Sequence, residues 1–197
     1  MGIIFYNALY HKCYFNNLIN IKNETIKILY LIMKFLLIFI ISCGLSMNTV
    51  ENLDLEKFMG KWYVISNIPN FIERNHQNSY DIYSLNKNGT IDISYFGEKN
   101  GKIIHLKQKA TVTDTINNSS WKIRLTKPYI PFFRAPYKVI ILDKNYDYMV
   151  VGYKNNTLGW VMSRNKIMSE EIYDNIMNEL ENNFNYKRNN FNKIIHK

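Results

Sequence analysis

Cysteine is scarce in this chain of 197 residues, which has only Cys13 and Cys43. The part after residue 43 therefore has no internal disulfide and no cysteine pair for a structural zinc ion. The sequence also lacks a nucleotide-binding glycine loop and the Gly-x-Ser-x-Gly motif of serine hydrolases. Its later histidines, His76, His105 and His196, are isolated from one another. We expect them to be exposed or structural, and we expect no metal, no cofactor and no enzymatic activity.

Blocks of like charge are absent as well. The chain has 25 basic and 16 acidic residues, and residues 1–42 contain four lysines and one glutamate, which leaves +6 on the remainder. These charges are spread out, with no run of five or six of one sign. Nucleic-acid binding is therefore not expected. Attraction to anionic lipid head groups is physically reasonable.

One long apolar run, residues 26–42, is interrupted only by Lys27 and Lys34. Met33 and Lys34 precede seven apolar residues, and Ser42 and Cys43 follow, which is the layout of a secretory signal. A cysteine after the small residue resembles a bacterial lipoprotein signal, where the cysteine is acylated and becomes the first mature residue. An ordinary cleaved signal and an uncleaved membrane helix remain alternatives. Lys34 disfavours the helix by about 2.5–3.5 kcal/mol at mid-membrane.

These features divide the chain into four parts. Residues 1–32 show no period, cap or motif, and we interpret them as a disordered or non-native extension. Residues 33–42 are the predicted lipoprotein signal peptide, residues 43–54 a tether, and residues 55–197 a single folded domain. The part after Ser42 is long enough to bury about 70% of its unfolded surface.

The predicted domain begins with a repeated unit, a strand of alternating apolar residues followed by a polar turn such as Asn88-Gly89. Eight such strands in simple up-and-down order leave two exposed edges unless the sheet closes. Closure gives a barrel that can hold one small ligand. The predicted strands are Lys61–Ile68, Gln77–Leu85, Thr90–Phe96, Ile103–Thr113, Trp121–Thr126, Tyr137–Leu142, Tyr148–Tyr153 and Gly159–Ser163.

A helix is predicted to follow the strands, beginning at Ser169, which can cap it. Its apolar positions recur at helical spacing and should lie on the outside of the barrel, over Tyr63 and Ile65. Residues 191–195 can add a final edge strand. The predicted apolar stripe consists of Ile172, Ile176, Met177 and Leu180.

Three short segments, in this order, resemble the signatures of the lipocalin family. They are Phe58-Met59-Gly60-Lys61-Trp62-Tyr63, then Tyr137-Lys138-Val139-Ile140-Ile141-Leu142-Asp143 with Tyr146, and Trp160-Val161-Met162-Ser163-Arg164. Residues 68–74 and 131–133 are similar to the branch with bacterial outer-membrane lipocalins, apolipoprotein D and plant temperature-induced lipocalins. The resemblance implies an all-β fold, an eight-stranded antiparallel up-and-down calycin barrel with a C-terminal α-helix packed outside.

The resemblance also implies roles for the signature residues. In lipocalins the tryptophan that matches Trp62 plugs the closed end of the barrel. The arginine that matches Arg164 stacks across it and binds backbone carbonyls there. We therefore assign Gly60, Trp62 and Arg164 to the scaffold.

Ligand contacts are expected from inward-facing positions farther from Trp62. One departure is Asp81, which falls at a predicted inward position. Either the strand is locally out of register, or a carboxylate faces the cavity and needs a Lys, an Arg or a polar ligand group. Glu73 and Arg74 could form an ion pair or a head-group site at the barrel mouth. The candidate ligand-binding residues are Tyr83, Ile93, Tyr95, Leu106, Trp121, Ile123, Tyr137 and Met149.

The function expected from the sequence is lipid binding by a protein that acylated Cys43 anchors in a membrane. The ligand would be a fatty acid or lysophospholipid, stored or transported in the cell envelope by a monomer or homodimer. Gly44 after the cysteine favours the outer membrane by analogy with enteric bacteria, with the barrel facing the periplasm. Two alternatives are a binder of haem or another small hydrophobic metabolite, with His105 the first candidate residue, and a small lipid-modifying enzyme that uses Asp81.

Overall fold

The structure is a computed structural model that describes residues 47–132 and 134–197. The predicted extension over 1–32, the signal over 33–42, the alternative membrane helix over 26–42 and Cys43 lie outside the described residues. Within the described ranges, no helix has the length and apolar character needed to span a membrane.

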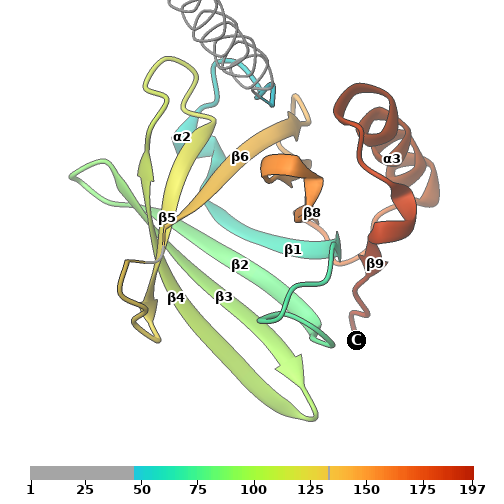
Figure 1. Ribbon diagram of the computed structural model, residues 1–197, viewed down its shortest axis with the longest axis horizontal. Coiled ribbons are helices and arrows are strands. Elements are labelled where there is room, and N and C mark those ends of the chain that lie inside the picture. The colour runs from blue at the N-terminus through green and yellow to red at the C-terminus, as the bar shows by residue number, and fades with distance from the viewer. Residues whose placement is uncertain (1–46, 133) are drawn as a thin grey trace, which may run out of the picture. The chain divides into compact units, whose positions relative to one another are not determined.

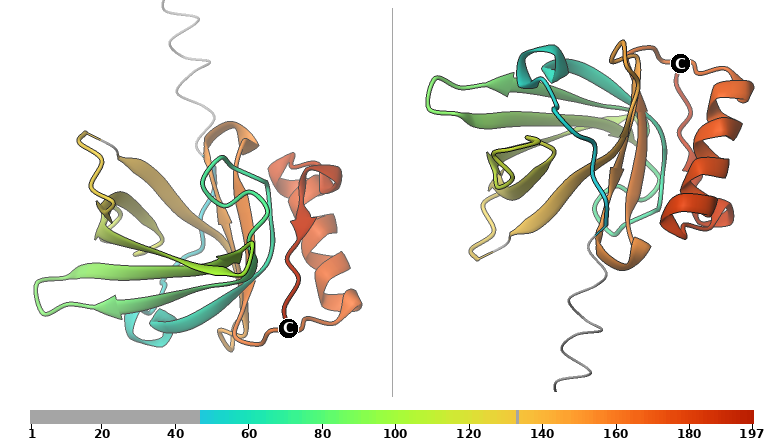
Figure 2. Two further views of the ribbon diagram at one scale, coloured as in Figure 1. Left: turned by 90° about the horizontal axis from the view of Figure 1, so that it is seen from below. Right: turned by 90° about the horizontal axis from the view of Figure 1, so that it is seen from above.

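The described residues form a closed antiparallel barrel (Figure 1). Consecutive strands pair in the order β2 to β8, β8 pairs with β1, and β1 pairs with β2 to close the sheet. Figure 2 shows the strands curving around a common interior. The predicted eight-stranded barrel is thus confirmed. Its strands are β1 (Gly60–Asn67), β2 (Gln77–Leu85), β3 (Thr90–Lys99), β4 (Lys102–Val112), β5 (Ser120–Lys127), β6 (Ala135–Leu142), β7 (Tyr148–Gly152) and β8 (Gly159–Ser163).

Alternation along each strand decides which side chains face the interior. In β5, Trp121, Ile123 and Leu125 are buried, whereas Lys122 and Arg124 between them are exposed. This period of two is what a sheet with one apolar and one solvated face requires. The polar residues therefore cover the outside of the barrel, and the apolar residues form its core.

A short helix, α2 (Leu55–Phe58), lies at one end of the barrel, where the side chain of Asp54 caps it. Phe58 is fully buried, and Leu53 just before the helix is 2% exposed in the same core cluster. The backbone N–H of Leu53 donates to Asn117, 2.9 Å away, and that of Val50 donates to Val139, 3.0 Å away. The tether predicted over 43–54 is therefore corrected, because residues from Val50 onward already pack on the barrel.

Arg164 and Trp62 seal this closed end as expected. The guanidinium carbon of Arg164 lies 3.8 Å from the centroid of the Trp62 ring, a cation–π contact of about 0.5–2 kcal/mol. Arg164 also donates to the carbonyls of Lys61 at 2.9 Å and Lys57 at 2.7 Å. Gly60 has a positive φ of 95°, and a Cβ there would lie 3.4 Å from an Arg164 nitrogen. The scaffold role assigned to all three signature residues agrees with these contacts.

The long helix α3 (Glu170–Phe184) packs on the outside of the barrel. Ser169 caps it by accepting from the Ile172 N–H at 3.3 Å. The predicted stripe needs one correction, because Ile172 is 39% exposed and Tyr173 takes its place in the interface. One residue rotates a helix by about 100°, so the side that contains Tyr173, Ile176, Met177 and Leu180 excludes Ile172.

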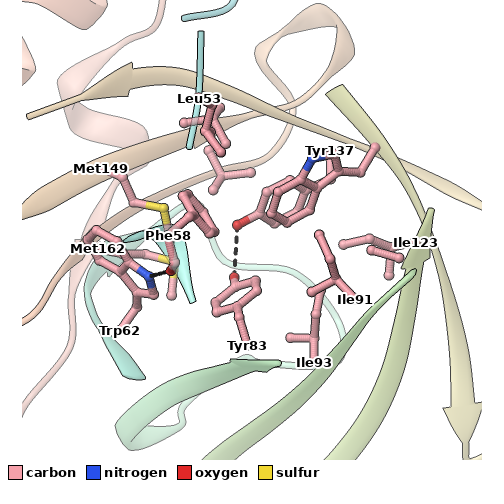
Figure 3. Packing of buried hydrophobic residues seen from close by; sticks show 14 of the residues in the cluster. Leu53, Phe58, Trp62, Tyr83, Ile91, Ile93, Ile123, Tyr137, Met149 and Met162 are labelled. Atoms are coloured by element: carbon pink, nitrogen blue, oxygen red, sulfur yellow. Dashed lines mark hydrogen bonds between the residues drawn. The ribbon is translucent and has the colours of Figure 1, made fainter. Parts of the chain in front are cut away.

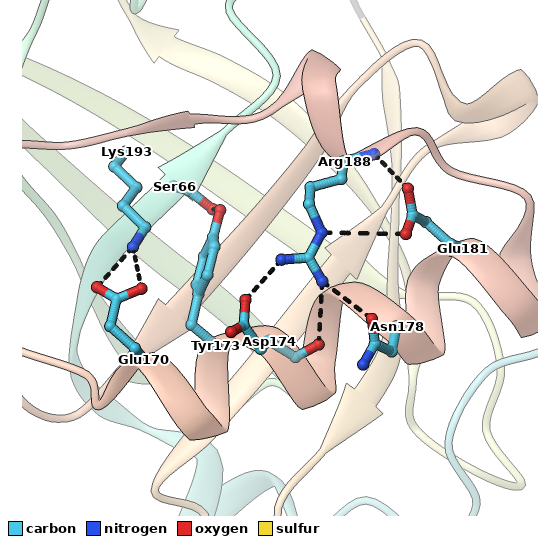
Figure 4. A network of polar contacts seen from close by, with 8 residues as sticks. All are labelled: Ser66, Glu170, Tyr173, Asp174, Asn178, Glu181, Arg188 and Lys193. Carbon is cyan, nitrogen blue, oxygen red and sulfur yellow. Dashed lines mark hydrogen bonds and ion pairs between the residues drawn. The ribbon is translucent and has the colours of Figure 1, made fainter.

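Polar contacts fix both α3 and the chain after it (Figure 4). The Tyr173 hydroxyl donates to Ser66 of β1 at 3.1 Å. The predicted edge strand is present as β9 (Asn192–Lys193), which pairs with Ser66 and Asn67 of β1 beyond the point where β2 leaves it. Lys193 also forms an ion pair with Glu170 at the start of the helix.

Candidate functional site

The barrel encloses a cavity of about 290 Å³ at the end opposite Trp62. A volume near 300 Å³ is at the lower limit for small-molecule sites. Strands β2 to β8 all contribute to its wall, and residues 70–73 of the connection between β1 and β2 close over it. The interior thus has a sealed, packed end and an end formed by loops, which is where a ligand can enter.

Six of the eight predicted ligand-binding residues line this cavity. They share an inward orientation and a position above the packed end of the barrel. These six residues are Tyr83, Ile93, Tyr95, Leu106, Ile123 and Tyr137.

Trp121 and Met149 require a correction, because neither lines the cavity and both are buried in the core cluster. The Trp121 ring stacks on Tyr137, with centroids 4.8 Å apart and planes 2° apart, and meets the edge of Phe58 at 5.2 Å. Met149 is fully buried in the same cluster. Alternation gives the face of a residue but not its depth, so both residues point inward at a level that neighbouring side chains fill.

Two tyrosines form the boundary between this core and the cavity. The hydroxyl oxygens of Tyr83 on β2 and Tyr137 on β6 lie 2.8 Å apart, joining opposite walls of the barrel (Figure 3). Burial raises the pKa of both phenols well above the usual value. Both are therefore neutral at physiological pH, and the pair presents oxygen atoms to an otherwise apolar floor.

Asp81 faces the cavity, so the hypothesis of a register shift at this residue is wrong. The β2–β3 pairing runs without interruption from Tyr80 to Leu85, with Asp81 opposite Tyr95, and the irregularity lies before Tyr80. The Asp81 side chain lines the cavity, and the residue is 9% exposed. Its inward position follows directly from the alternation with Tyr83.

The carboxyl group of Asp81 is poorly satisfied. Its Oδ2 accepts only a long bond of 3.5 Å from the Tyr83 hydroxyl, and its Oδ1 is buried without a partner among the described residues. Burial, and then the nearby Glu73 carboxyl, raise the pKa of Asp81 well above its usual value, against a smaller lowering by Tyr83. The group is thus protonated well above the pH at which an exposed aspartate ionises.

Glu73 comes from the loop but turns into the barrel. Its Oε2 accepts from the Trp160 indole N–H at 2.7 Å and from the Asn67 side-chain amide at 2.9 Å. Burial raises the pKa of Glu73, against the lowering effect of these bonds. The predicted ion pair with Arg74 is therefore corrected: Glu73 is held inside by Trp160 and Asn67, while Arg74 is exposed.

A tight turn explains why Glu73 points inward. The side-chain oxygen of Asn70 accepts from the N–H groups of Ile72 at 2.9 Å and Glu73 at 3.0 Å. An asparagine that bonds to the backbone two and three residues later is a recognised turn signal. The turn could have been predicted from the sequence. The hydrogen bond between Glu73 and Trp160 of β8 could not, because the two residues are far apart in the chain.

A second polar cluster lies above Asp81. The Tyr95 hydroxyl is 2.8 Å from Nδ1 of buried His76 and 3.2 Å from the Ser79 hydroxyl. Burial, followed by the positive charge of Lys99, lowers the pKa of His76. Gly97 makes room for this cluster, since a Cβ there would lie 2.7 Å from the Tyr95 hydroxyl.

The other two histidines lie away from the cavity. His105 stacks on Phe96 with ring centroids 4.2 Å apart, on the outer face of the sheet. The His196 ring bonds the carbonyl of Val64 at 2.9 Å and packs against Tyr63. All three positions agree with a structural or exposed role. Among residues 47–132 and 134–197, no group of three His, Cys, Asp or Glu side chains is arranged to hold a metal ion.

Several lining residues were not among the sequence candidates. Gln108 and Leu125 continue the inward rows that include Leu106 and Ile123, so alternation could have identified both. Trp160 was interpreted only as part of the third lipocalin signature and not as a residue of the cavity wall. The further lining residues that were missed include Val151, Tyr153, Leu158, Met162, Ala135 and Pro136.

The wall of the cavity is apolar and aromatic with a localised acidic region. Among the described residues that line it, none is a lysine or an arginine. Glu73 lies close enough to Asp81 to contribute to the raised pKa of the Asp81 carboxyl. A molecule that enters would meet hydrocarbon and aromatic surface, together with oxygen atoms from Glu73, Asp81 and the tyrosines.

Comparison with known proteins agrees with this architecture. A family model described as a lipocalin-like domain matches residues 53–195. Temperature-induced lipocalin-1 from Arabidopsis thaliana is 28% identical over 137 residues, 67% of this chain and 74% of the plant protein. The outer membrane lipoprotein Blc of Escherichia coli K12 is 25% identical over 129 residues, 64% of this chain and 71% of the bacterial protein.

Solved structures show the same fold. Insecticyanin from the tobacco hornworm Manduca sexta superimposes with a TM-score of 0.61 at 13% identity. The match covers 77% of this chain and 85% of insecticyanin. At this identity the likeness concerns the fold alone.

Proposed function

This chain belongs to the lipocalin family, and from that premise we propose that it binds a single-chain lipid, a fatty acid or a lysophospholipid, inside the barrel. Lipocalins are in general proteins that bind and transport small hydrophobic ligands rather than enzymes. The supporting observation is the cavity, which is lined mainly by aliphatic and aromatic side chains and lies beneath a loop. An acyl chain that leaves water for this wall gains about 0.8 kcal/mol per buried CH₂.

Exposed apolar side chains near the loops support exchange of this ligand with a membrane. Phe132 is 96% exposed, Tyr129 is 70% exposed and Ile103 is 78% exposed. Tyr129 and Phe132 belong to the β5–β6 connection, and Ile103 lies at the start of β4, next to the β3–β4 turn. Both connections lie at the same end of the antiparallel barrel as residues 70–73. Lys102 and Lys127 flank them in the sequence. Apolar tips with nearby basic residues suit insertion into an anionic lipid surface.

We further propose that acylated Cys43 holds the barrel at an outer membrane, facing the periplasm. The lipoprotein-like pattern of Phe35 to Cys43 supports this, as does the relation to a bacterial protein named as an outer membrane lipoprotein. Labelling cells with a fatty-acid analogue tests it. The label should be lost in Cys43→Ser and kept in Cys13→Ser. Absence of label from the wild type, or retention of label in Cys43→Ser, would contradict the anchor.

The ligand itself is tested on the purified protein. We expect organic extraction and mass spectrometry to recover a single-chain lipid in a near-stoichiometric amount. We also expect fatty acids or lysophospholipids to displace N-phenylnaphthylamine, an uncharged apolar dye. The proposal would be overturned if the purified protein contained no amphiphile and neither fatty acids nor lysophospholipids displaced the bound dye. The haem alternative is less favoured, since His105 lies on the outer face of the sheet.

A further inference from the structure

Two carboxyl groups, those of Asp81 and Glu73, point into the cavity, and no lysine or arginine is present among the described residues of its wall. Glu73 has two hydrogen-bond donors, Trp160 and Asn67, which hold it in place. Asp81 has one long contact and a buried Oδ1 without any partner among the described residues. A buried carboxyl left in this state costs about 1–3 kcal/mol.

Such a cost, placed in the wall of a ligand cavity, points to a ligand that removes it. An ionised carboxylate only accepts hydrogen bonds, so a ligand group that stabilises the ionised state of Asp81 must donate them. A positive charge on the same group would also relieve the repulsion between the two carboxyls. The same wall contains the aromatic residues Tyr83, Tyr95 and Trp160, a residue type whose ring attracts cations.

We propose that the Glu73–Asp81 pair receives the protonated amine of a hydrophobic ligand. This inference rests on the proposed function, because it takes the cavity to be a binding site for an amphiphile and specifies the polar group that the site recognises. Of the two lipid classes named above, it favours lysophospholipids whose head group contains a protonated primary amine. A fatty acid would instead place a third carboxyl group beside the first two.

Binding of the amine is coupled to release of a proton. In the free protein burial raises the pKa of Asp81 well above its usual value, so its carboxyl keeps a proton up to a higher pH than an exposed aspartate does. The ligand enters as R–NH₃⁺ and keeps its proton, while the Asp81 proton passes to the buffer and leaves a carboxylate paired with the ammonium. The other titratable groups near Asp81 are Glu73, Tyr83, Tyr95 and Tyr137. The Tyr95 hydroxyl is also bonded to Nδ1 of His76, whose pKa is lowered by burial.

The test compares three ligands that have the same alkyl chain length and different polar groups: decylamine, decanol and decanoic acid. Their affinities are measured by displacement of N-phenylnaphthylamine from the wild type, from Asp81→Asn and from the control Asp92→Asn. Asp92 lies on the adjacent strand β3, but on the outside of the barrel, where it pairs with Lys109. Its substitution makes the same chemical change, carboxyl to amide, without touching the cavity. Calorimetry in buffers of different ionisation enthalpy measures the protons released.

For the wild type and Asp92→Asn we expect decylamine to bind most tightly and to release a proton. Asp81→Asn should weaken decylamine binding by roughly thirtyfold, the effect of removing one member of a buried charge pair, and should leave decanol binding unchanged. Proton release should disappear in this variant.

Two results would overturn the inference while leaving the proposed function intact. One is decanoic acid that binds more tightly than decylamine, which would mean that protonated Asp81 donates to a ligand oxygen. The other is decylamine binding that does not change in Asp81→Asn. Failure of all three molecules and of lysophospholipids to displace the dye would instead contradict the proposed function itself.

Discussion

The hydroxyl oxygens of Tyr83 and Tyr137 lie 2.8 Å apart across the interior of the barrel, and the Tyr83 hydroxyl also reaches Asp81 at 3.5 Å. The three groups form one short chain of hydrogen bonds that links β2 to β6. Tyr83 is its central member, because it alone contacts both neighbours. This arrangement connects the stability of the cavity floor with the state of the carboxyl above it.

Removing the central hydroxyl should therefore have a larger effect than removing the terminal one. Tyr137→Phe deletes one bond and should lower the free energy of unfolding by about 1 kcal/mol. Tyr83→Phe should lower it further, since it leaves both Tyr137 and Asp81 without their partner. Urea unfolding of both variants and of the double variant measures this. Equal effects of the two substitutions would mean that the contact with Asp81 contributes nothing.

Asp81 should make the protein less stable as the pH rises. Below the unfolded-state pKa of about 4, both states hold the proton and no penalty exists. Above it the unfolded chain releases the proton, whereas the fold must keep it or bury a charge, because burial raises the folded-state pKa. The penalty grows until the pH passes that raised value. Asp81→Asn should thus be more stable than the wild type at pH 7, by about 1–3 kcal/mol, with little difference near pH 4.

Asp92→Asn is the control for this experiment, because its predicted effect on the free energy of unfolding has the opposite sign. The hydrogen bond to Lys109 lowers the pKa of Asp92, so the ionised group stabilises the fold above pH 4 and this contribution fades as the pH falls. Asp92→Asn should be slightly less stable than the wild type at neutral pH. Thermal unfolding from pH 4 to pH 8 compares the three proteins. If Asp92→Asn were also more stable than the wild type, the stabilisation of Asp81→Asn would come from the change in net charge and not from the cavity.

A lysine at position 164 should not be able to make the contacts of Arg164 that stabilise the closed end of the barrel. The guanidinium covers Trp62 and donates to several backbone carbonyls at once, and an ammonium cannot match this planar fork. We expect Arg164→Lys to lose about 2 kcal/mol of stability, the range of one or two hydrogen bonds from a charged donor. Dye binding below the unfolding transition should be retained, because Arg164 lies at the end away from the cavity. Arg188→Lys should lose less, because Arg188 follows α3 and forms solvent-exposed ion pairs with Asp174 and Glu181 of that helix.

The strands and the closed end were predictable because their causes are local in the sequence. Alternation such as that of Trp121, Ile123 and Leu125 follows from the pleat of a strand, and the sealing pair of Trp62 and Arg164 followed from signature motifs. Depth was not predictable in this way. Trp121 and Met149 point inward as expected, but what fills the barrel at their level is decided by residues far away in the sequence, including Phe58.

The acidic region of the cavity was only partly predictable. Alternation placed Asp81 inside the barrel, yet the cost of burying a carboxyl favoured a register shift in the strand. The rule that buried carboxyls are avoided failed here, at a candidate functional site. Glu73 could not be placed, since its position depends on Trp160, which is 87 residues away. On α3, the helical period gave a stripe, but the contact of Tyr173 with Ser66 fixed which side faces the barrel.

Transfer of ligand from a membrane should depend on Phe132. Burying this ring in lipid contributes about 1.5–3 kcal/mol, so Phe132→Ser should slow ligand uptake from anionic vesicles roughly tenfold or more. Affinity for dissolved dye should not change, because Phe132 does not line the cavity. Ile167→Ser is the control, since Ile167 is 84% exposed but follows β8 at the closed end. Equal slowing by both variants would exclude a specific role for the loop end.

The central claim is that the cavity holds the ligand, and filling it tests this most directly. Leu106→Trp adds an indole to the cavity wall, whereas Ile103→Trp, on the same strand, adds it to a side chain that is 78% exposed. The measurement is the dissociation constant of N-phenylnaphthylamine for the wild type and both folded variants. We predict a loss of at least about tenfold in Leu106→Trp and none in Ile103→Trp. Unchanged dye binding in folded Leu106→Trp would contradict a ligand site inside the barrel.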